Sequence, residues 1–231
     1  MATGPGNRPE ITHRLPEDIW QELCSLGRER HFRAGSRMLR QGDAGLHLLA
    51  LTEGLVKVIR REENGETTLL AFRGVGDLLG EGTTFDSRQL RIADVIALRP
   101  CRAVVLEAGR FRAFVESRGL VTDVMRQTLA RLRESDLRHA ELMTLSLCTR
   151  LARTLVRLVH LTTPAAGNAP LLLTGLTQEE LAQSIGVSRN AVVVGLQRLR
   201  DAGAVETARR AITIRDMNVL RAWAREAPGG L

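Results

Sequence analysis

Residues 176–203 constrain the fold of this chain more than any other stretch, because each of their local signals agrees with the next. They read LTQEELAQSIGVSRNAVVVGLQRLRDAG. Thr177 can cap a helix, and Glu180 stands three residues later, which is the spacing of a capping box. Gly186 can adopt the positive φ of a sharp turn, and Ser188 can cap a second helix. The stretch therefore predicts two short helices joined by a tight turn.

The apolar residues of this stretch predict that the two helices pack together. They recur at helical spacing and are Leu181, Ile185, Val187, Val192, Leu196 and Leu199. The alternative is a generic pair of antiparallel helices, but the short turn that ends in Val-Ser-Arg favours a helix-turn-helix that binds DNA. The outward positions of its second helix are Arg189, Asn190, Val193, Val194 and Gln197.

The distribution of charge agrees with a polyanionic partner. The chain carries +7 at pH 7. Residues 148–231 hold 11 arginines against 6 acidic residues, whereas residues 1–147 hold 22 basic residues against 20 acidic ones. The excess per residue is concentrated in the last third, where the helix-turn-helix is predicted. On charge alone, a merely soluble basic surface fits equally well.

From Phe32 to about Glu107 the sequence predicts a β-sandwich or barrel. Short apolar runs alternate with Gly or polar pairs, as in folds built from many short strands, and Asn64–Gly65 marks a hairpin turn. The preceding residues 15–29 predict a helix, because one side of it would carry apolar residues at helical spacing. These are Leu15, Ile19, Leu23 and Leu26.

Residues 120–146 contain no Gly or Pro and predict one helix of about 40 Å. A track at coiled-coil spacing runs along it through Val121, Met125, Thr128, Leu132, Ser135, His139 and Leu142. A partner helix across a two-fold axis would bury this track; the alternative is a helix packed on its own barrel. A second helix is expected from Leu147 to about Thr162, with Ser146 as its N-cap, and a loop of turn-forming residues at 162–170.

These motifs together resemble the CRP/FNR (catabolite activator) family of transcription regulators. The matching segments are the helix-turn-helix TQEELAQSIGVSR, the barrel segments AGSRMLRQGD, EGLVKV and GDLLGE, and the wing-like AVETARRAITI. The resemblance covers about residues 15–215. It implies an α+β chain with an N-terminal cyclic-nucleotide-binding-like β-barrel (jelly roll) at 1–119, a dimerisation helix at 120–146, and a C-terminal winged helix-turn-helix at 147–231.

The same resemblance implies a bacterial homodimer that binds double-stranded DNA at a two-fold symmetric operator and contacts RNA polymerase. Because the first residues lack an apolar signal core, we expect a cytoplasmic protein. Its predicted DNA-binding residues are Thr177, Ser188, Arg189, Asn190, Val193, Val194, Gln197, Arg209 and Arg210. Arg189 matches the arginine that the family aims at guanine, whose O6 and N7 fit a guanidinium bidentately.

Two residues of the second helix depart from the family's pattern. Asn190 stands where the family commonly has glutamate, and Val194 stands where it commonly has a second arginine. Asparagine can read adenine, whereas valine can only touch a thymine methyl group or exclude another base. The family's operator therefore does not carry over to this chain.

The family's cyclic-nucleotide cassette is Gly-Glu followed by Arg-Ser-Ala or Arg-Thr-Ala. Gly80–Glu81 matches its first part, but the triplet here is Arg91–Ile92–Ala93, so isoleucine replaces the hydroxyl that would donate to a phosphate. In the long helix, Ser135 and Asp136 align roughly with the family's adenine contacts. The predicted ligand-binding residues are Gly80, Glu81, Arg91, Ile92, Ala93, Ser135 and Asp136.

Three interpretations of the pocket stay open. Cyclic AMP or another cyclic nucleotide binds despite Ile92; another effector, such as a cyclic dinucleotide, binds the barrel or a different surface; or the barrel is a structural relic and the dimer binds DNA unaided. Glu81 and Arg91 would then form a buried ion pair. An iron–sulfur sensor would need a cysteine cluster where only Cys24 stands, and haem would need an axial ligand such as His47 or His139.

Other classes of protein are disfavoured by what the sequence lacks. No apolar run approaches the ~18 residues of a membrane span, and the first fourteen residues lack an apolar signal core. Three scattered cysteines form neither a disulfide framework nor a metal cluster. No catalytic constellation is recognisable, so we expect no enzyme. A cyclic-nucleotide-binding module of an enzyme or channel that does not bind DNA is the remaining alternative.

Overall fold

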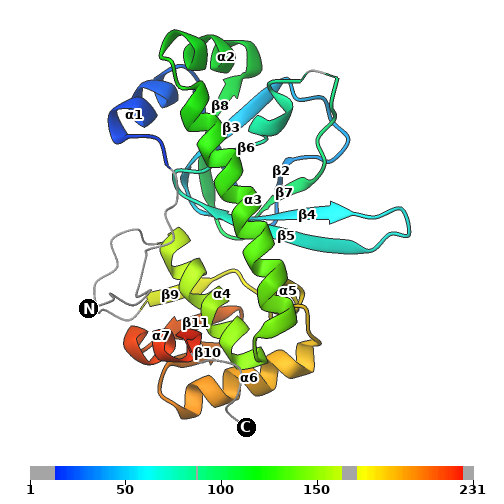
Figure 1. The fold of residues 1–231 in the computed structure, drawn as a ribbon, viewed down its shortest axis with the longest axis vertical. Helices are drawn as coiled ribbons and strands as arrows, with labels where there is room; N and C mark the ends of the chain where they lie inside the picture. Colours follow the sequence, from blue (N-terminus) through cyan, green and yellow to red (C-terminus); the bar gives the residue numbers. More distant parts are fainter. Residues whose placement is uncertain (1–13, 87, 163–170, 226–231) are drawn as a thin grey trace, which may run out of the picture.

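The computed structural model describes residues 14–86, 88–162 and 171–225. Its N-terminal part is a sandwich of two four-stranded antiparallel sheets, with strand orders β1-β8-β3-β6 and β2-β7-β4-β5 (Figure 1). The strands are β1 (Arg28–Phe32), β2 (Arg37–Leu39), β3 (His47–Glu53), β4 (Leu55–Arg61), β5 (Thr67–Gly74), β6 (Leu78–Leu79), β7 (Asp94–Ala97) and β8 (Cys101–Glu107). The arrangement confirms the predicted jelly-roll-like domain within an α+β chain.

Strand β3 is buried on both faces, since its residues 48–51 are all buried. The core between the sheets contains Leu49, Leu51, Val56, Val95 and Ala103, all buried, as expected when one face of each strand turns inward. The hairpin predicted at Asn64–Gly65 joins β4 to β5, which pair from Leu55 with Gly74 to Arg61 with Thr67.

Three helices pack in one apolar cluster with the sheet β1-β8-β3-β6, namely α1 (Glu17–Ser25), α2 (Ala108–Ser117) and α3 (Val121–Thr144). The predicted helix at 15–29 is too long, since it ends at Ser25 and Arg28–Phe32 forms β1 instead. The physical reason is long-range pairing: β1 lies antiparallel to β8, and Gly27 sits so close to the carbonyl of Val105 that a side chain would not fit.

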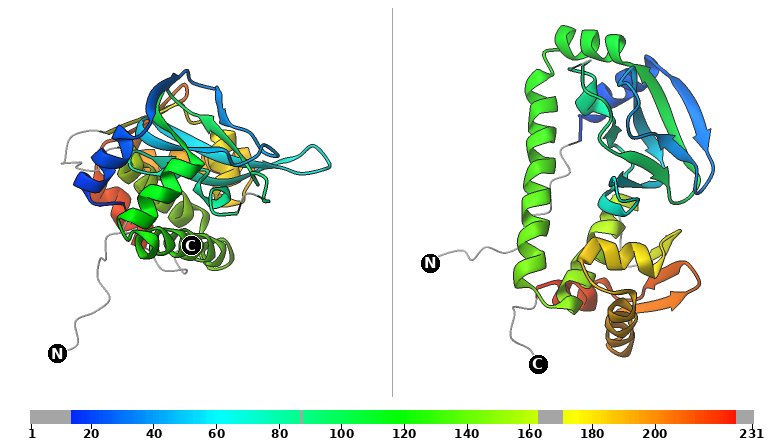
Figure 2. Two further views of the ribbon diagram at one scale, coloured as in Figure 1. Left: turned by 90° about the horizontal axis from the view of Figure 1, so that it is seen from above. Right: turned by 90° about the vertical axis from the view of Figure 1, so that its right-hand side faces the viewer.

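The helix α3 runs along the whole molecule, with the sandwich and the C-terminal part on the same side of it (Figure 2, right). The apolar residues of its predicted coiled-coil track are exposed in the single chain, among them Met125 and Leu132 at 61% and 58%. Its inward face is mostly ionic, because Arg131, Glu134 and Glu141 pair with charged residues of the sandwich and of the next helix.

The C-terminal part contains the predicted helix-turn-helix and wing. Its elements are α4 (Leu147–Thr162), β9 (Leu171–Thr174), α5 (Gln178–Ile185), α6 (Arg189–Asp201), β10 (Val205–Ala208), β11 (Ala211–Ile214) and α7 (Met217–Arg225). Ser146 accepts a hydrogen bond from the amide of Thr149 at 3.3 Å, which confirms the predicted N-cap of α4. The strand β9, which pairs with β11, was not predicted.

The sandwich and the C-terminal part share one apolar core. Leu55, Phe72 and Leu98 of the sandwich belong to the cluster that contains Leu158 of α4 and Leu181 of α5. Gly74 leaves no room for a side chain against the carbonyl of Leu161.

An ion pair also crosses this boundary. Lys57, the single lysine of the chain, donates to Glu180 of α5 at 2.7 Å. Strand β4 of the sandwich is therefore tied directly to the first helix of the helix-turn-helix.

None of the helices in the described ranges is long and apolar enough to cross a membrane. Residues 1–13, which were interpreted as lacking a signal core, lie outside the described residues. So does nearly all of the loop predicted at 162–170.

Candidate nucleic-acid interface and effector pocket

The local signals read from the sequence fix both helices of the helix-turn-helix. Thr177 and Glu180 form the predicted capping box, with the hydroxyl of Thr177 accepting from the amide of Glu180 at 3.1 Å. Gly186 ends α5 with φ 64°. The hydroxyl of Ser188 accepts from the amide of Ala191 at 3.2 Å and begins α6. Thr177 and Ser188, both predicted to bind DNA, thus use their side chains as helix caps.

One face of α6 is buried and the opposite face is exposed. Val192, Leu196 and Leu199 are buried in the shared core, and Gly195 leaves no room for a side chain against Leu147 and Leu151. The exposed strip contains the five residues predicted to face DNA, which are Arg189, Asn190, Val193, Val194 and Gln197. Because one face of α6 packs into the shared core, its opposite face is exposed over the N-terminal turns, as a recognition helix requires.

Gln197 is less free than the other residues of this strip. Its amide nitrogen donates to Asp201 at 2.6 Å, and its amide oxygen accepts from Arg200. Arg200 in turn donates to Thr207 of β10 at 2.8 Å. This network ties the end of α6 to the wing rather than leaving Gln197 available to a base.

The wing turn carries the two predicted arginines. Arg209 and Arg210 are exposed between β10 and β11. Arg210 has φ 57°, and its guanidinium donates to the carbonyl of Gly175 at 3.2 Å. The wing thus presents two cations beside the recognition helix.

The predicted effector pocket brings Gly80 and Arg91 into contact. Arg91 is buried, at 5% exposure, and its Nη2 donates to the carbonyl of His47 at 2.6 Å. Its Nη1 is buried and has no hydrogen-bond partner in the described part of the chain. That atom lies where a side chain at position 80 would stand, and Gly80 has φ 81°. Only glycine fits there comfortably.

Burial dominates the electrostatics of Arg91. Removal from water lowers the pKa of Arg91, while the carboxylates of Asp43 and Glu81 act in the opposite direction. Burial also lowers the pKa of His47, and the charge of Arg91 adds to that effect. A buried guanidinium with an unused donor suits an anion, because desolvated charges are stabilised by direct partners.

Glu81 does not pair with Arg91, contrary to the alternative considered from the sequence. It pairs instead with Arg131 of α3, whose Nη2 donates to the carbonyl of Leu78 at 2.7 Å and lies 3.5 Å from Asp77. Sequence reasoning missed Arg131. The signal that could have revealed it is an arginine one helical turn before Ser135, on a helix expected to border the pocket.

The remaining predicted ligand residues occupy different environments. Ala93 is buried, whereas Ile92 is 69% exposed. Ser135 and Asp136 are exposed on α3. Leu46, Phe85 and Leu90 are also exposed.

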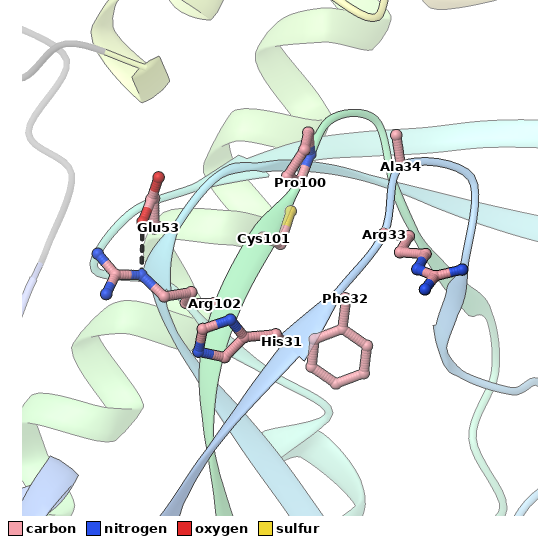
Figure 3. A pocket seen from close by; sticks show the side chains of 8 residues that line it. All are labelled: His31, Phe32, Arg33, Ala34, Glu53, Pro100, Cys101 and Arg102. Atoms are coloured by element: carbon pink, nitrogen blue, oxygen red, sulfur yellow. Dashed lines mark hydrogen bonds and ion pairs between the residues drawn. The ribbon is translucent and has the colours of Figure 1, made fainter.

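A separate hollow of about 560 Å³ lies at the end of the sandwich (Figure 3). It is lined by His31, Phe32, Arg33, Ala34, Glu53, Pro100, Cys101 and Arg102. The ion pair of Glu53 with Arg102, at 2.5 Å, forms part of its wall. The hollow shares no residue with the predicted effector set.

The chain matches two family models, one for each part. Residues 29–118 match the cyclic nucleotide-binding domain, and residues 149–223 match the Crp-like helix-turn-helix domain. The CRP-like cAMP-activated global transcriptional regulator of Mycobacterium tuberculosis is 29% identical over 195 residues, which are 84% of this chain and 87% of that protein.

Solved structures show the same fold. A CRP-family transcriptional regulator of Thermus thermophilus is 25% identical, with a TM-score of 0.70 over 87% of this chain and 100% of that one. The c-di-GMP responsive global regulator CLP of Xanthomonas campestris is 20% identical, with a TM-score of 0.63 over 86% of this chain and 99% of that one.

These matches define a regulator with a cyclic nucleotide-binding domain and a DNA-binding helix-turn-helix domain. The chain belongs to the CRP/FNR family of transcriptional regulators.

Proposed function

We propose that this regulator is a homodimer that reads a two-fold symmetric operator with α6 and is controlled by a small anionic effector bound beside Arg91. The observation that carries the effector proposal is the buried Nη1 of Arg91, which has no hydrogen-bond partner in the described residues. A guanidinium that is already desolvated and still has a donor to offer is prepared for a phosphate. Contact with RNA polymerase stays a prediction of the family resemblance.

A cyclic mononucleotide is the effector class that fits this floor best. Gly80 permits close approach to Arg91, and Glu81 supplies a carboxylate at the same wall. A phosphate would take the free donor of Arg91, and a ribose hydroxyl would suit the carboxylate. The relative from Mycobacterium tuberculosis is named as cAMP-activated, which supports cyclic AMP as the first candidate.

A specific observation favours a second candidate. Glu81 is already paired with Arg131, and the exposed Ile92 offers no hydroxyl to a phosphate. The second candidate is therefore a cyclic dinucleotide that binds the barrel or a different surface without using these two residues. The c-di-GMP responsive regulator of Xanthomonas campestris has the same fold.

The dimer proposal rests on the outer face of α3. Its exposed apolar side chains are Val121, Met125, Leu129, Leu132, Leu137, Leu142 and Met143. Most of them lie on one face of the helix, which Thr128, Ser135 and His139 interrupt. An exposed apolar face on a long helix calls for a partner, and a second copy would bury it across a two-fold axis.

Isothermal calorimetry with cyclic AMP, cyclic GMP and cyclic di-GMP, followed by gel shift on random duplex DNA with each ligand, tests the proposal. Cyclic AMP or cyclic GMP should bind with one site per chain and change DNA affinity. Binding of cyclic di-GMP alone would select the second candidate. Absence of DNA binding under every condition would contradict the DNA-binding function itself.

A further inference from the structure

The surface of α6 carries an unusual pair of exposed apolar residues. In the described C-terminal part, from Leu147 to Arg225, the large hydrophobic residues with exposed side chains are Leu172, Val193 and Val194. Two of these three stand on the strip that faces outward from the recognition helix. Val193 is 42% exposed and Val194 is 54% exposed. The fold does not use them for its own core.

Each valine lies one helical turn after a polar residue with base-reading chemistry. Val193 follows Arg189 by four positions and Val194 follows Asn190 by four, so each pair shares one side of the helix. Gln197, the next residue of this strip, is held by Asp201 and Arg200. The strip therefore offers a guanidinium, a carboxamide and two isopropyl groups, and little else, to whatever it contacts.

We propose that Val193 and Val194 select thymine. Their isopropyl groups pack against C5-methyl groups in the major groove, next to the bases that Arg189 and Asn190 read. This inference rests on the proposed DNA-reading role of α6. Thymine alone presents a methyl group in the major groove, whereas the groove edges of guanine, cytosine and adenine offer mainly hydrogen-bonding atoms. Valine against those polar atoms would leave them without hydrogen-bond partners.

The charge around the valines favours DNA over a protein as the occupant of this strip. Arg189, Arg198 and Arg200 are exposed on the same helix, and Arg209 and Arg210 are exposed on the wing. A cationic frame around a small apolar patch matches a groove with phosphates on both sides. A protein partner would need complementary acidic groups at each of these positions.

The first experiment identifies the operator and locates its thymines. Binding sequences are selected from random duplexes with the full chain, once without ligand and once with cyclic AMP. The guanine that Arg189 reads is the one that the Arg189→Ala variant no longer distinguishes from other bases. We expect thymines next to that guanine. Each such thymine is then replaced by uracil, which lacks only the C5-methyl group. Affinity should fall about three- to fourfold per methyl group, and on the order of tenfold when both half-sites are changed.

A double-mutant cycle assigns this loss to the valines. On the thymine duplex, Val193→Ala and Val194→Ala should each lower affinity by a similar factor. On the uracil duplex, the variant whose methyl partner has been removed should lose nothing further. Leu172→Ala is the matched control, since Leu172 is 57% exposed but lies outside the strip, and it should bind both duplexes like the wild type.

The outcomes separate the inference from the function beneath it. An operator whose affinity is unchanged by uracil at every enriched thymine would overturn the thymine proposal and leave DNA reading intact. Equal losses of the valine variants on both duplexes would also overturn it, because the valines would then act without the methyl groups. If neither selection enriches any sequence, the proposed DNA-reading role fails and the inference falls with it.

Discussion

The recognition strip of α6 and the effector pocket differ in how much of their chemistry is free. On α6, Arg189, Asn190 and both valines are exposed, and the caps that orient the helix lie within residues 177–191. In the pocket, Glu81 is already engaged by Arg131, which lies 50 residues away in the chain. Arg91 is the exception, since it keeps one donor unused.

This difference shows which kind of site a motif can specify. A helix cap and an outward strip depend on neighbours in sequence, so a short motif determines them. A pocket between a strand end and a distant helix depends on tertiary contacts, so a motif names some residues and misses others. The helix α3 borders both regions, because Arg131 pairs with Glu81 of the pocket and Leu142 lies beside Gly186 in the turn of the helix-turn-helix.

Breaking the dimer should have the largest effect of all on DNA reading. Leu132→Asp would place two carboxylates in the proposed seam, and we expect a monomer in sedimentation velocity. The monomer would contact one half-site, so operator affinity should collapse while the sandwich stays folded by circular dichroism. Leu172→Asp, which changes a leucine of nearly equal exposure outside α3, should remain dimeric. An intact Leu132→Asp dimer would refute the seam.

Arg91→Ala tests whether the unused donor defines the pocket. Leaving a buried phosphate without its counter-charge costs about 3–5 kcal/mol, so cyclic AMP affinity should fall by roughly two to four orders of magnitude in calorimetry. Arg88→Ala is the control, because Arg88 is a nearby arginine that is 90% exposed. The substitution breaks no ion pair with Glu81, which pairs with Arg131, but it removes the hydrogen bond to the carbonyl of His47, so the melting temperature should fall only modestly. A large drop in melting temperature with unchanged ligand affinity would favour the structural-relic interpretation.

Arg189→Ala makes the matching test on α6. Loss of a bidentate contact to guanine should weaken specific binding by about 1–3 kcal/mol per base contact and spare most non-specific affinity. Arg198→Ala, on the same helix, should instead weaken specific and random duplexes alike if it contacts only phosphates. Fluorescence anisotropy on both duplexes measures the difference. Equal losses for Arg189→Ala on both would show that it is only a phosphate contact.

The sequence predicted the elements whose signals are local. The capping box at Thr177 and Glu180, the turn at Gly186 and the cap at Ser188 all form as expected, as does the hairpin at Asn64–Gly65. The helix predicted at 15–29 is too long, because the pairing of β1 with β8 overrides the helical spacing of its apolar residues.

The contacts that the sequence could not predict join residues far apart in the chain. Arg131 with Glu81 and Lys57 with Glu180 are separated by 50 and 123 residues. Nothing in the spacing of a single sequence encodes such pairs. Arg91 was identified by its motif, but its burial and its unused donor emerged only from the folded chain.

Ile92→Ser tests how far the missing hydroxyl weakens the pocket. A new hydrogen bond to a charged phosphate contributes about 1.5–3 kcal/mol and a neutral one about 0.5–1.5, so cyclic AMP affinity should rise on the order of tenfold in calorimetry. Because Ile92 is exposed, the change should leave the melting temperature unaltered. The matched control is Leu90→Ser, because Leu90 is also exposed, whereas Ala93 is buried. An equal gain in cyclic AMP affinity from Leu90→Ser would show that the hydroxyl at position 92 makes no specific hydrogen bond to the phosphate.

The smallest predicted effect is a shift in the titration of His47. Burial and the neighbouring Arg91 and Arg30 lower the pKa of His47, against an opposing contribution from Asp43. The unfolded chain therefore binds this proton more readily than the folded one, and folding stability should decrease as the pH falls below about 6.5.

An anion bound to Arg91 would offset its charge, so cyclic AMP should raise the pKa of His47. Proton NMR titration of the His47 ring, assigned with His47→Gln and with His160 of α4 as the internal control, measures that shift. Arg91→Ala should raise the pKa of His47 without ligand and abolish its response to the nucleotide. A His47 pKa that responds to Arg91→Ala but not to cyclic AMP would mean that the effector binds away from Arg91.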